Sequence, residues 1–348
     1  MMSFIIYKAI LCVVVFGLSL FIAMYSTLWE RKFASFLQDR VGPDRAGPWG
    51  ILQPLADGGK LFFKEEIVPN VSNKFLFILG PCLFMITALM TGVVIPWGKD
   101  VMVNGTTYAL QITDINIGIL YLFGVVSIGV YGIMIGGWAS NNKYALLGAI
   151  RASSQMISYE IAMGLAVIAL VITAGGTLSL REIVEKQDAG LANIVYQPLG
   201  FIIFFICALA ETNRAPFDLP ECESELVGGY HTEYSSMKLG LFLFAEYINM
   251  FISSAIMSAF YFGGYNFPFA HELYNAMGLQ EGSVWIALIG FGAFFTKTLI
   301  FISVFMWVRW TLPRFRYDQL MNLGWKILIP LALVNLAITS VVMYLVNK

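Results

Sequence analysis

Eight long apolar stretches constrain this chain more than any other feature. A helix that crosses a lipid bilayer needs about 20 apolar residues in succession, and most of the eight stretches meet that length. They cover residues 3–28, 75–97, 115–139, 152–174, 197–211, 239–262, 284–308 and 325–346. Because 58% of the residues are hydrophobic and the mean hydropathy is +0.75, we expect one polytopic, all-α membrane domain over residues 1–348.

The third stretch is rich in glycine, which is typical of closely packed membrane helices. Its glycines are Gly124, Gly129, Gly132, Gly136 and Gly137. The eight stretches show no internal repeat, and this weakens the interpretation of the chain as a carrier built from inverted halves.

Basic residues between the stretches predict the orientation. If the loop after the first stretch is cytoplasmic, fifteen Lys and Arg residues lie on the cytoplasmic side and five on the other, with Lys297 inside a span. Cytoplasmic loops are enriched in basic residues. We therefore expect cytoplasmic loops at 29–74, 140–151, 212–238 and 309–324, with both termini on the opposite side.

The first of these loops contains the segment GPWGILQPLADGGKLFFKEE, residues 47–66. Its apolar residues recur near helical spacing, with Asp57, Lys60 and Lys64 on the other side. The pattern predicts an amphipathic helix at the membrane interface, and a surface helix that anchors the loop is the alternative.

Metal and nucleic-acid sites are not expected. The cysteines Cys12, Cys82, Cys207 and Cys222 lack metal-ligand spacing, and the chain has two histidines, too few for a zinc or iron–sulfur site. Any redox metal would belong to another subunit. The net charge of −1 offers no basic face to nucleic-acid phosphates.

The segment AETNRAPFDLPECESELVGG, residues 210–229, gathers negative charge next to the fifth stretch. Pro216 and Pro220 prevent a continuous helix, so we expect the segment to be ordered by a partner surface or by Arg214, its one basic residue, bridging the acids. Its carboxylates are Glu211, Asp218, Glu221, Glu223 and Glu225.

Two acids and a lysine lie deeper in the predicted spans. At 1.5 Å per residue, Glu160 lies about 13 Å, Glu246 about 12 Å and Lys297 about 18 Å from the nearest basic residue at the cytoplasmic end. Charges persist in a membrane when they are paired or hydrated, so we expect Lys297 to face a glutamate. Carboxylates clustered with Glu211 can relay protons. Structural ion pairs are the alternative.

Three motifs carry a family resemblance: ERKFASFLQDRVGPDRAGPWGILQPLADGGKLFFKE (30–65), AETNRAPFDLPECESELVGGYHTEYSSMKLGLFLFAEY (210–247) and PRFRYDQLMNLGWK (313–326). The chain resembles the membrane H-subunit family of respiratory complex I, the NADH:quinone oxidoreductase. The resemblance implies a place in the bacterial cytoplasmic membrane, among other membrane subunits and beside the peripheral arm. There the family forms a quinone chamber with two peripheral subunits, one of which carries the terminal iron–sulfur cluster.

The resemblance also implies residue roles. Quinone is the substrate, whereas flavin and iron–sulfur clusters belong to partner subunits. The chamber wall or entrance would include Glu30, Arg31, Gln38, Arg40, Asp57 and Lys60, with Phe244 and Arg309 as further candidates. The family's acidic funnel into the membrane would comprise Glu160, Glu211, Asp218, Glu221, Glu223, Glu225, Glu233 and Glu246, and the residues themselves suggest Lys297 and a structural Arg214 beside it.

Two other functions stay open from the sequence. A related subunit of a membrane-bound hydrogenase-type complex would share the acidic funnel without a quinone site. A stand-alone carrier is disfavoured by the missing repeat and by an acidic loop that requires a partner.

Overall fold

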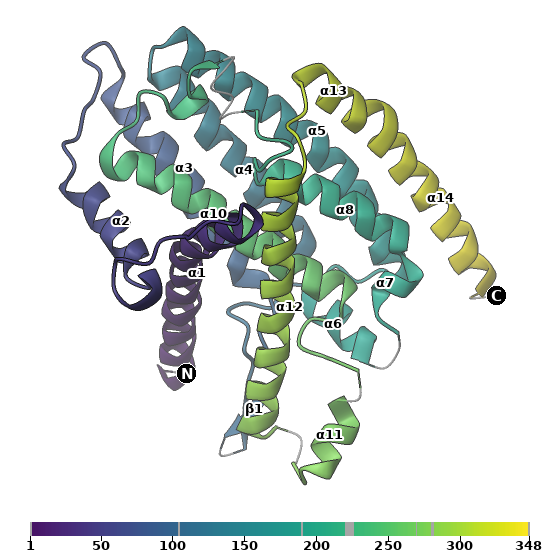
Figure 1. The fold of residues 1–348 in the computed structure, drawn as a ribbon. Helices are drawn as coiled ribbons and strands as arrows, with labels where there is room; N and C mark the ends of the chain where they lie inside the picture. Colours follow the sequence, from purple (N-terminus) through teal and green to yellow (C-terminus); the bar gives the residue numbers. More distant parts are fainter. Residues whose placement is uncertain are drawn as a thin grey trace.

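Seven helices in the described part of the chain are long and apolar enough to cross a membrane (Figure 1). The structure, a computed structural model, describes residues 2–103, 105–188, 191–219, 226–268, 270–279 and 282–346. Six of the seven are α1 (Met2–Leu37), α3 (Lys74–Thr91), α4 (Gly118–Ala139), α5 (Lys143–Thr173), α10 (Ser236–Tyr261) and α12 (Val284–Thr311). The seventh joins α13 (Tyr317–Asn322), a π-helical turn (Leu323–Leu328) and α14 (Ile329–Val346).

The fifth apolar stretch forms α8 (Pro198–Glu211), which is shorter than the seven. Together these helices confirm an all-α polytopic membrane protein. The remaining short elements are the 3-10 turns Pro48–Gly50, Gly92–Val94 and Gly229–His231, and the helices α2 (Gln53–Phe63), α6 (Leu180–Asp188), α7 (Asn193–Tyr196) and α11 (Ala270–Ala276).

The sequence did not predict the one small sheet of the described residues. Strands β1 (Val101–Val103) and β2 (Thr106–Tyr108) pair antiparallel, with Val101 opposite Tyr108. Three residues a strand are too few for an alternating pattern to be recognised.

The amphipathic helix expected in the first loop is α2, a short helix against the outside of the bundle. Leu61 reaches α10, where a Cβ added to Gly240 would lie 3.2 Å from a Leu61 methyl group. Phe62 and Phe63 are exposed. One side of α2 thus packs on α10, while the apolar side chains of Phe62 and Phe63 on another side of α2 stay exposed.

Two helices extend well beyond their apolar stretches. Helix α1 continues to Leu37, past the charged residues that end the stretch at 28. Helix α5 begins at Lys143, nine residues before its stretch, because the Asn142 side chain accepts a hydrogen bond of 2.9 Å from the amide of Tyr144. Such a cap satisfies an amide that the first turn leaves unpaired.

Helix packing is tightest between α3 and α4. A Cβ on Gly80 of α3 would lie 2.8 Å from the Cα of Gly136, and a Cβ on Gly132 would lie 2.9 Å from the amide nitrogen of Phe84. Four of the five glycines predicted to pack closely do so. A Cβ added to the fifth, Gly124, would meet no other atom within 4 Å. The missing side chains let the two backbones touch.

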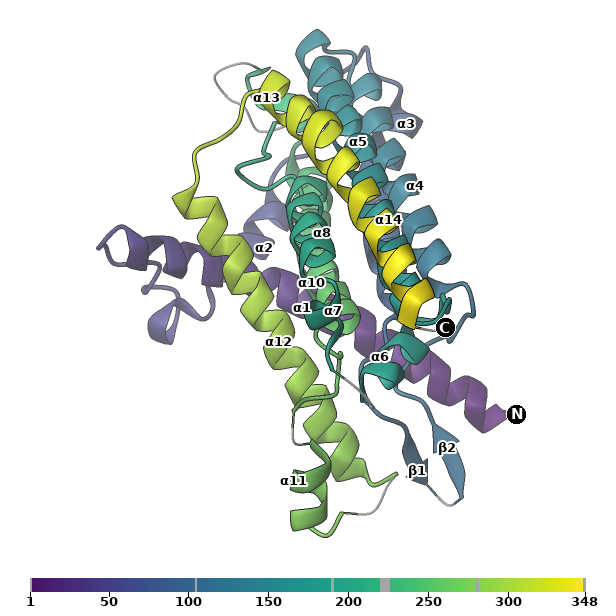
Figure 2. The same ribbon diagram turned by 90° about the vertical axis from the view of Figure 1, so that its right-hand side faces the viewer.

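The helices place the functional groups at two ends of the bundle. Helix α13 lies at one end, and β1 and α11 lie at the other (Figure 1). Figure 2 shows α1 running across the bundle, inclined to α12 and α14, with α2 beside its C-terminal part. Helix α10 is the most enclosed of the seven, with 67% of its most apolar window buried against 17% for α1.

Candidate functional site

A buried ion cluster surrounds the carboxylate of Glu30, near the end of α1. Its Oε2 accepts a hydrogen bond of 2.9 Å from the Tyr247 hydroxyl and lies 3.2 Å from Nη1 of Arg214. Its Oε1 pairs with Nη1 of Arg309. The cluster joins α1, the loop after α8, α10 and α12, and Glu30 is 5% exposed. A carboxylate so buried requires partners of this kind.

Arg214 lies at the centre of this cluster. Its guanidinium stacks over the ring of Tyr247, 4.0 Å from the centroid, while its Nε and Nη2 are buried without a hydrogen-bond partner in the described part of the chain. Burial alone would lower the pKa of Arg214, but Tyr247, Glu30 and Glu246 outweigh it and raise the pKa above its ordinary value. Arg214 therefore stays charged, and it pairs with Glu30 of α1, outside its own loop.

A cavity of about 190 Å³ lies between α1, α2 and α10, beside the ion cluster. Arg31 and Asp57 form an ion pair of 2.7 Å in its wall, and Tyr247 lines it as well. The rest of the wall is mostly apolar, with Met24, Thr27, Pro54, Leu61, Leu243 and Phe244. An apolar wall with a few polar groups at fixed positions is typical of small-molecule sites.

The residues expected around a quinone chamber divide into three groups. Arg31, Asp57 and Phe244 line the cavity. Glu30 and Arg309 belong to the ion cluster. The third group lies on the exposed surface outside the cavity lining, with Nε of Arg40 bonded to Oε1 of Gln38 at 2.7 Å; it consists of Gln38, Arg40 and Lys60.

Three of the predicted acids lie on the helices; Glu211 and Glu246 are buried, and Glu160 is half-buried. The Ser127 hydroxyl of α4 donates a hydrogen bond to Glu160 of α5, and Glu160 is close enough to Glu211 for their charges to interact. The Tyr230 hydroxyl donates to Oε1 of Glu246 at 2.9 Å.

Other acids of the predicted funnel have separate partners. Asp218 is buried and pairs with Arg314 at 2.7 Å, while Glu233 accepts a hydrogen bond of 2.7 Å from the Asn142 side chain. Glu221, Glu223 and Glu225 lie outside the described residues.

The expectation that Lys297 faces a glutamate is wrong. Its ammonium donates to the carbonyl of Phe262 at 2.7 Å, to that of Gly264 at 2.8 Å and to that of Asn266. These carbonyls follow the end of α10, where the helix leaves backbone acceptors unpaired. An ammonium has three donors, so Lys297 fastens the chain where it leaves α10.

Sequence reasoning missed three hydroxyl groups of this region: those of Tyr247, Tyr230 and Ser127. Tyr247 directly follows Glu246 in a predicted span, but adjacent residues on a helix do not face each other, and its hydroxyl bonds Glu30, 217 residues away. Tyr230 and Ser127 are far from their acids in sequence, so nothing in the pattern linked them.

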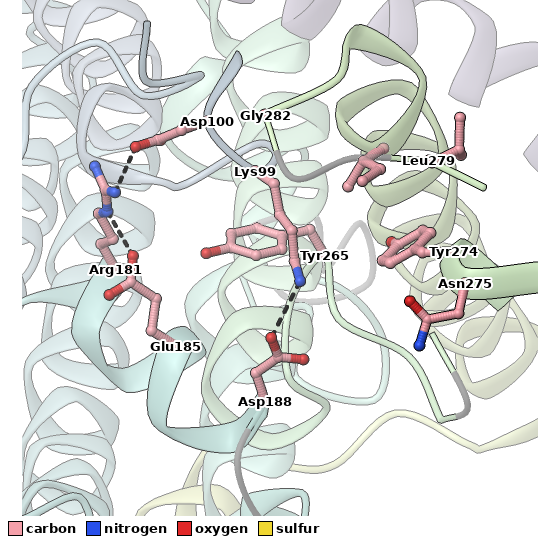
Figure 3. A pocket seen from close by; sticks show the side chains of 11 residues that line it. Lys99, Asp100, Arg181, Glu185, Asp188, Tyr265, Tyr274, Asn275, Leu279 and Gly282 are labelled. Carbon is pink, nitrogen blue, oxygen red and sulfur yellow. Dashed lines mark hydrogen bonds and ion pairs between the residues drawn. The ribbon is translucent and has the colours of Figure 1, made fainter. Parts of the chain in front are cut away.

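A second charged pocket, of about 310 Å³, lies at the β1 and α11 end (Figure 3). Arg181 of α6 pairs with Asp100 and with Glu185, each at 2.7 Å, and Lys99 reaches Asp188 at 3.1 Å. These charges pair mostly with one another. The ion pairs Arg181–Asp100 and Lys99–Asp188 therefore hold the start of the β-hairpin against α6.

Comparisons with known proteins identify the family. A family model described as NADH dehydrogenase matches residues 9–340. The chain is 67% identical over 338 residues to H subunit 1 of the NADH-quinone oxidoreductase of Cytophaga hutchinsonii, covering 97% of each chain. It is 60% identical over 340 residues to the H subunit of the Flavobacterium johnsoniae enzyme (98% of this chain and 96% of the other), and 47% identical over 315 residues to subunit 8 of the Rhodothermus marinus enzyme (89% of each). The chain therefore belongs to the NADH dehydrogenase family, alongside the H subunits of NADH-quinone oxidoreductase, and its enzymatic role is that of one subunit in a larger complex.

Proposed function

We propose that the chain forms part of the quinone site of a proton-translocating NADH:quinone oxidoreductase and couples quinone reduction to proton transfer through buried acids. The names of its relatives support this function over a hydrogenase-type complex or a stand-alone carrier. Electrons would reach the quinone from an iron–sulfur cluster of the peripheral arm, supplied through a flavin in that arm. The membrane would be the bacterial cytoplasmic membrane, with both termini on the far side.

One observation carries the proposal: Tyr247 lines the cavity and also bonds Glu30. A quinone head group in the cavity would therefore lie on the same side chain that holds the buried carboxylate. Reduction of a quinone to a quinol adds two electrons and takes up two protons. Quinone and quinol are both neutral, so the charge beside Glu30 would change where protein groups supply the two protons, and groups held by ion pairs respond to such changes.

Arg214 gives this response a route into the membrane. Its charge interacts with Glu30, which it pairs with at 3.2 Å, and with Glu246, and Glu246 accepts a hydrogen bond from Tyr230. A proton that neutralises Glu30 would weaken its hold on Arg214 and leave more positive charge facing Glu246. Glu160 and Glu211 would form the next pair in the path, with Asp218, Glu233 and the acids at 221, 223 and 225 at its mouth.

The peripheral arm would close the chamber from outside. Gln38, Arg40 and Lys60 are exposed beyond the cavity lining, so they would reach the chamber where partner subunits cover α2 and the end of α1. The apolar side chains of Phe62 and Phe63 would meet the bilayer interface or the same partners.

The test replaces one side chain of the cavity wall in the assembled complex. Phe244→Trp adds bulk to the cavity, so the KM for quinone should rise about tenfold, as expected for a loss of ~1.4 kcal/mol of binding. Leu241→Trp, on the same helix but outside the lining, is the matched control. NADH oxidation with a water-soluble artificial electron acceptor reports an intact peripheral arm. Equal quinone kinetics for the two variants would rule out this cavity as the quinone site.

A further inference from the structure

An apolar-walled cavity lies beside α14 at the β1 and α11 end, away from the Glu30 cluster. It has a volume of about 410 Å³, against about 190 Å³ for the cavity beside Glu30. Helix α14 forms one wall, and the C-terminal end of α5, α6 and residues 191–197 form the other. Its volume falls within the range of about 300–1,000 Å³ found for small-molecule sites.

The α14 wall is apolar and continues onto the outer surface of the bundle. Ile338, Val342 and Val346 line the cavity and are 57%, 49% and 72% exposed, respectively. They lie four residues apart and so follow one face of the helix. In a membrane, this face continues from the cavity into the surrounding acyl chains.

The deepest polar groups of the cavity need no ligand. Gln197 donates to the Thr339 hydroxyl at 2.7 Å, and Asn335 donates to Oε1 of Gln197 at 3.0 Å. Thr339 in turn donates to the carbonyl of Asn335. Because these side chains satisfy one another, an apolar occupant can cover them without leaving a hydrogen bond unmade.

Lys186 supplies a positive charge at the opposite side of the cavity. Its ammonium donates to the carbonyl of Ala174 at 2.6 Å, which leaves two of its three donors. The acids near it in α6 are engaged elsewhere: Glu182 with Thr177, Glu185 with Arg181 and Asp188 with Lys99. Within the described residues, no ion pair joins Lys186 to a carboxylate.

Tyr196 completes the rim of the cavity. Its ring is exposed and lines the same opening as Lys186. Tyrosine rings and lysine ammonium groups gather where a membrane meets water, the ring among the head groups and the charge toward phosphate. The rim therefore has the chemistry of a head-group contact, and the α14 wall has that of an acyl-chain contact.

We propose that this cavity binds one anionic phospholipid, with an acyl chain along Ile338, Val342 and Val346 and the phosphate beside Lys186. The single positive charge matches one phosphate, and the apolar wall matches one of the two acyl chains of the lipid. This site is independent of the quinone site, because it lies at the other end of the bundle and shares no residue with it.

The assembled complex, reconstituted into nanodiscs of phosphatidylcholine, tests the proposal. A trace of phosphatidylglycerol carrying a photoreactive group in its acyl chain is added, and labelled peptides are mapped by mass spectrometry. We expect labelling of α14 in the parent complex. It should fall about fivefold in Lys186→Gln, which matches the effect of one lysine on an anionic lipid. Lys143→Gln, an exposed lysine at the other end of α5, is the control and should label like the parent.

A second variant separates charge from shape. Val342→Trp narrows the cavity without changing its charge, so labelling of α14 should also fall in this variant. NADH oxidation with an artificial acceptor should be unchanged. Equal labelling of α14 by a phosphatidylcholine probe, or unchanged labelling in both variants, would show unspecific boundary lipid and overturn the site. Absence of lipid labelling in the parent, with crosslinks from a photoreactive residue at 342 to another subunit, would make the occupant a protein helix and equally overturn it.

Discussion

Tyr247 donates its hydroxyl proton to Oε2 of Glu30 over 2.9 Å, and the same side chain lines the cavity between α1, α2 and α10. Its ring also lies under the guanidinium of Arg214. A single residue thus touches the cavity, the buried carboxylate and one of the arginines that neutralise it. Changes at Tyr247 should therefore separate binding in the cavity from the response of the cluster.

Tyr247→Phe removes the hydroxyl and keeps the ring beneath Arg214. We expect the kcat of quinone reduction to fall about tenfold, which corresponds to ~1.4 kcal/mol in the barrier, while the KM changes less. Steady-state kinetics of the purified complex measure both values. Tyr131→Phe, at an exposed position of α4, serves as the control. A kcat equal to that of the parent would remove Tyr247 from the coupling route.

Arg31→Ala and Asp57→Ala each break the ion pair in the cavity wall. The two side chains are 50% and 35% exposed, so the pair should contribute less than about 1 kcal/mol to stability. Assembly should persist while the KM for quinone rises. In the double variant, the combined loss should be smaller than the sum of the two single losses in free energy, because both remove the same pair. Strictly additive effects would mean that the pair does not act as a unit.

Lys297→Met leaves three backbone carbonyls without their donor. Each unsatisfied buried group costs about 1–3 kcal/mol, so the complex should lose thermal stability, seen as a lower Tm. Enzyme that does assemble should pump a normal number of protons per electron. Thr296→Ala, at the neighbouring exposed position, is the control. A stable Lys297→Met complex that reduces quinone without pumping would return Lys297 to the proton path.

Glu211→Gln and Glu160→Gln test the pair of interacting acids on α8 and α5. Gln keeps the size and hydrogen-bonding capacity of Glu but cannot titrate, so each variant should lower proton pumping about 100-fold, at the low end of the range that positioned proton-transfer groups contribute. Because the two groups interact, their titrations are coupled, and the double variant should depart from the product of the singles. Glu182→Gln, on α6 and bonded to Thr177, provides the control. Normal pumping in both single variants would make the pair structural.

The helices could be predicted from the sequence because apolar run length is a local property. Where charged residues interrupt a run, the predicted span ends too early. The first stretch ends at residue 28, yet α1 continues to Leu37, and Glu30 remains helical with partners from three distant segments. Those partners are not visible in a local window, so the end of the helix could not be placed.

The sequence predicted where charged residues lie along the helices better than it predicted which groups their side chains contact. Lys297 was placed correctly inside a span, but its partners are backbone carbonyls, which every residue carries and no residue pattern reveals. The resemblance placed Arg31, Asp57, Gln38, Arg40 and Lys60 around a quinone chamber. Of these, Arg31 and Asp57 line the cavity, whereas the other three lie outside its lining. Their distance from the cavity depends on how α1 and α2 are inclined, which is a property of packing.

The Glu30 cluster also bears on how the chain is made. Glu30 precedes Arg214 by 184 residues, Tyr247 by 217 and Arg309 by 279. At about 5 to 20 residues per second, a ribosome reaches Arg309 roughly 15 to 55 s after Glu30. During that interval the first helix is already available for insertion. For about the first two thirds of it, neither Arg214 nor Arg309 has been synthesised, so Glu30 has no arginine partner. Glu30 lies seven residues before the end of α1, about 10 Å along the helix, so a small axial shift can keep it at the water interface until α12 has been synthesised.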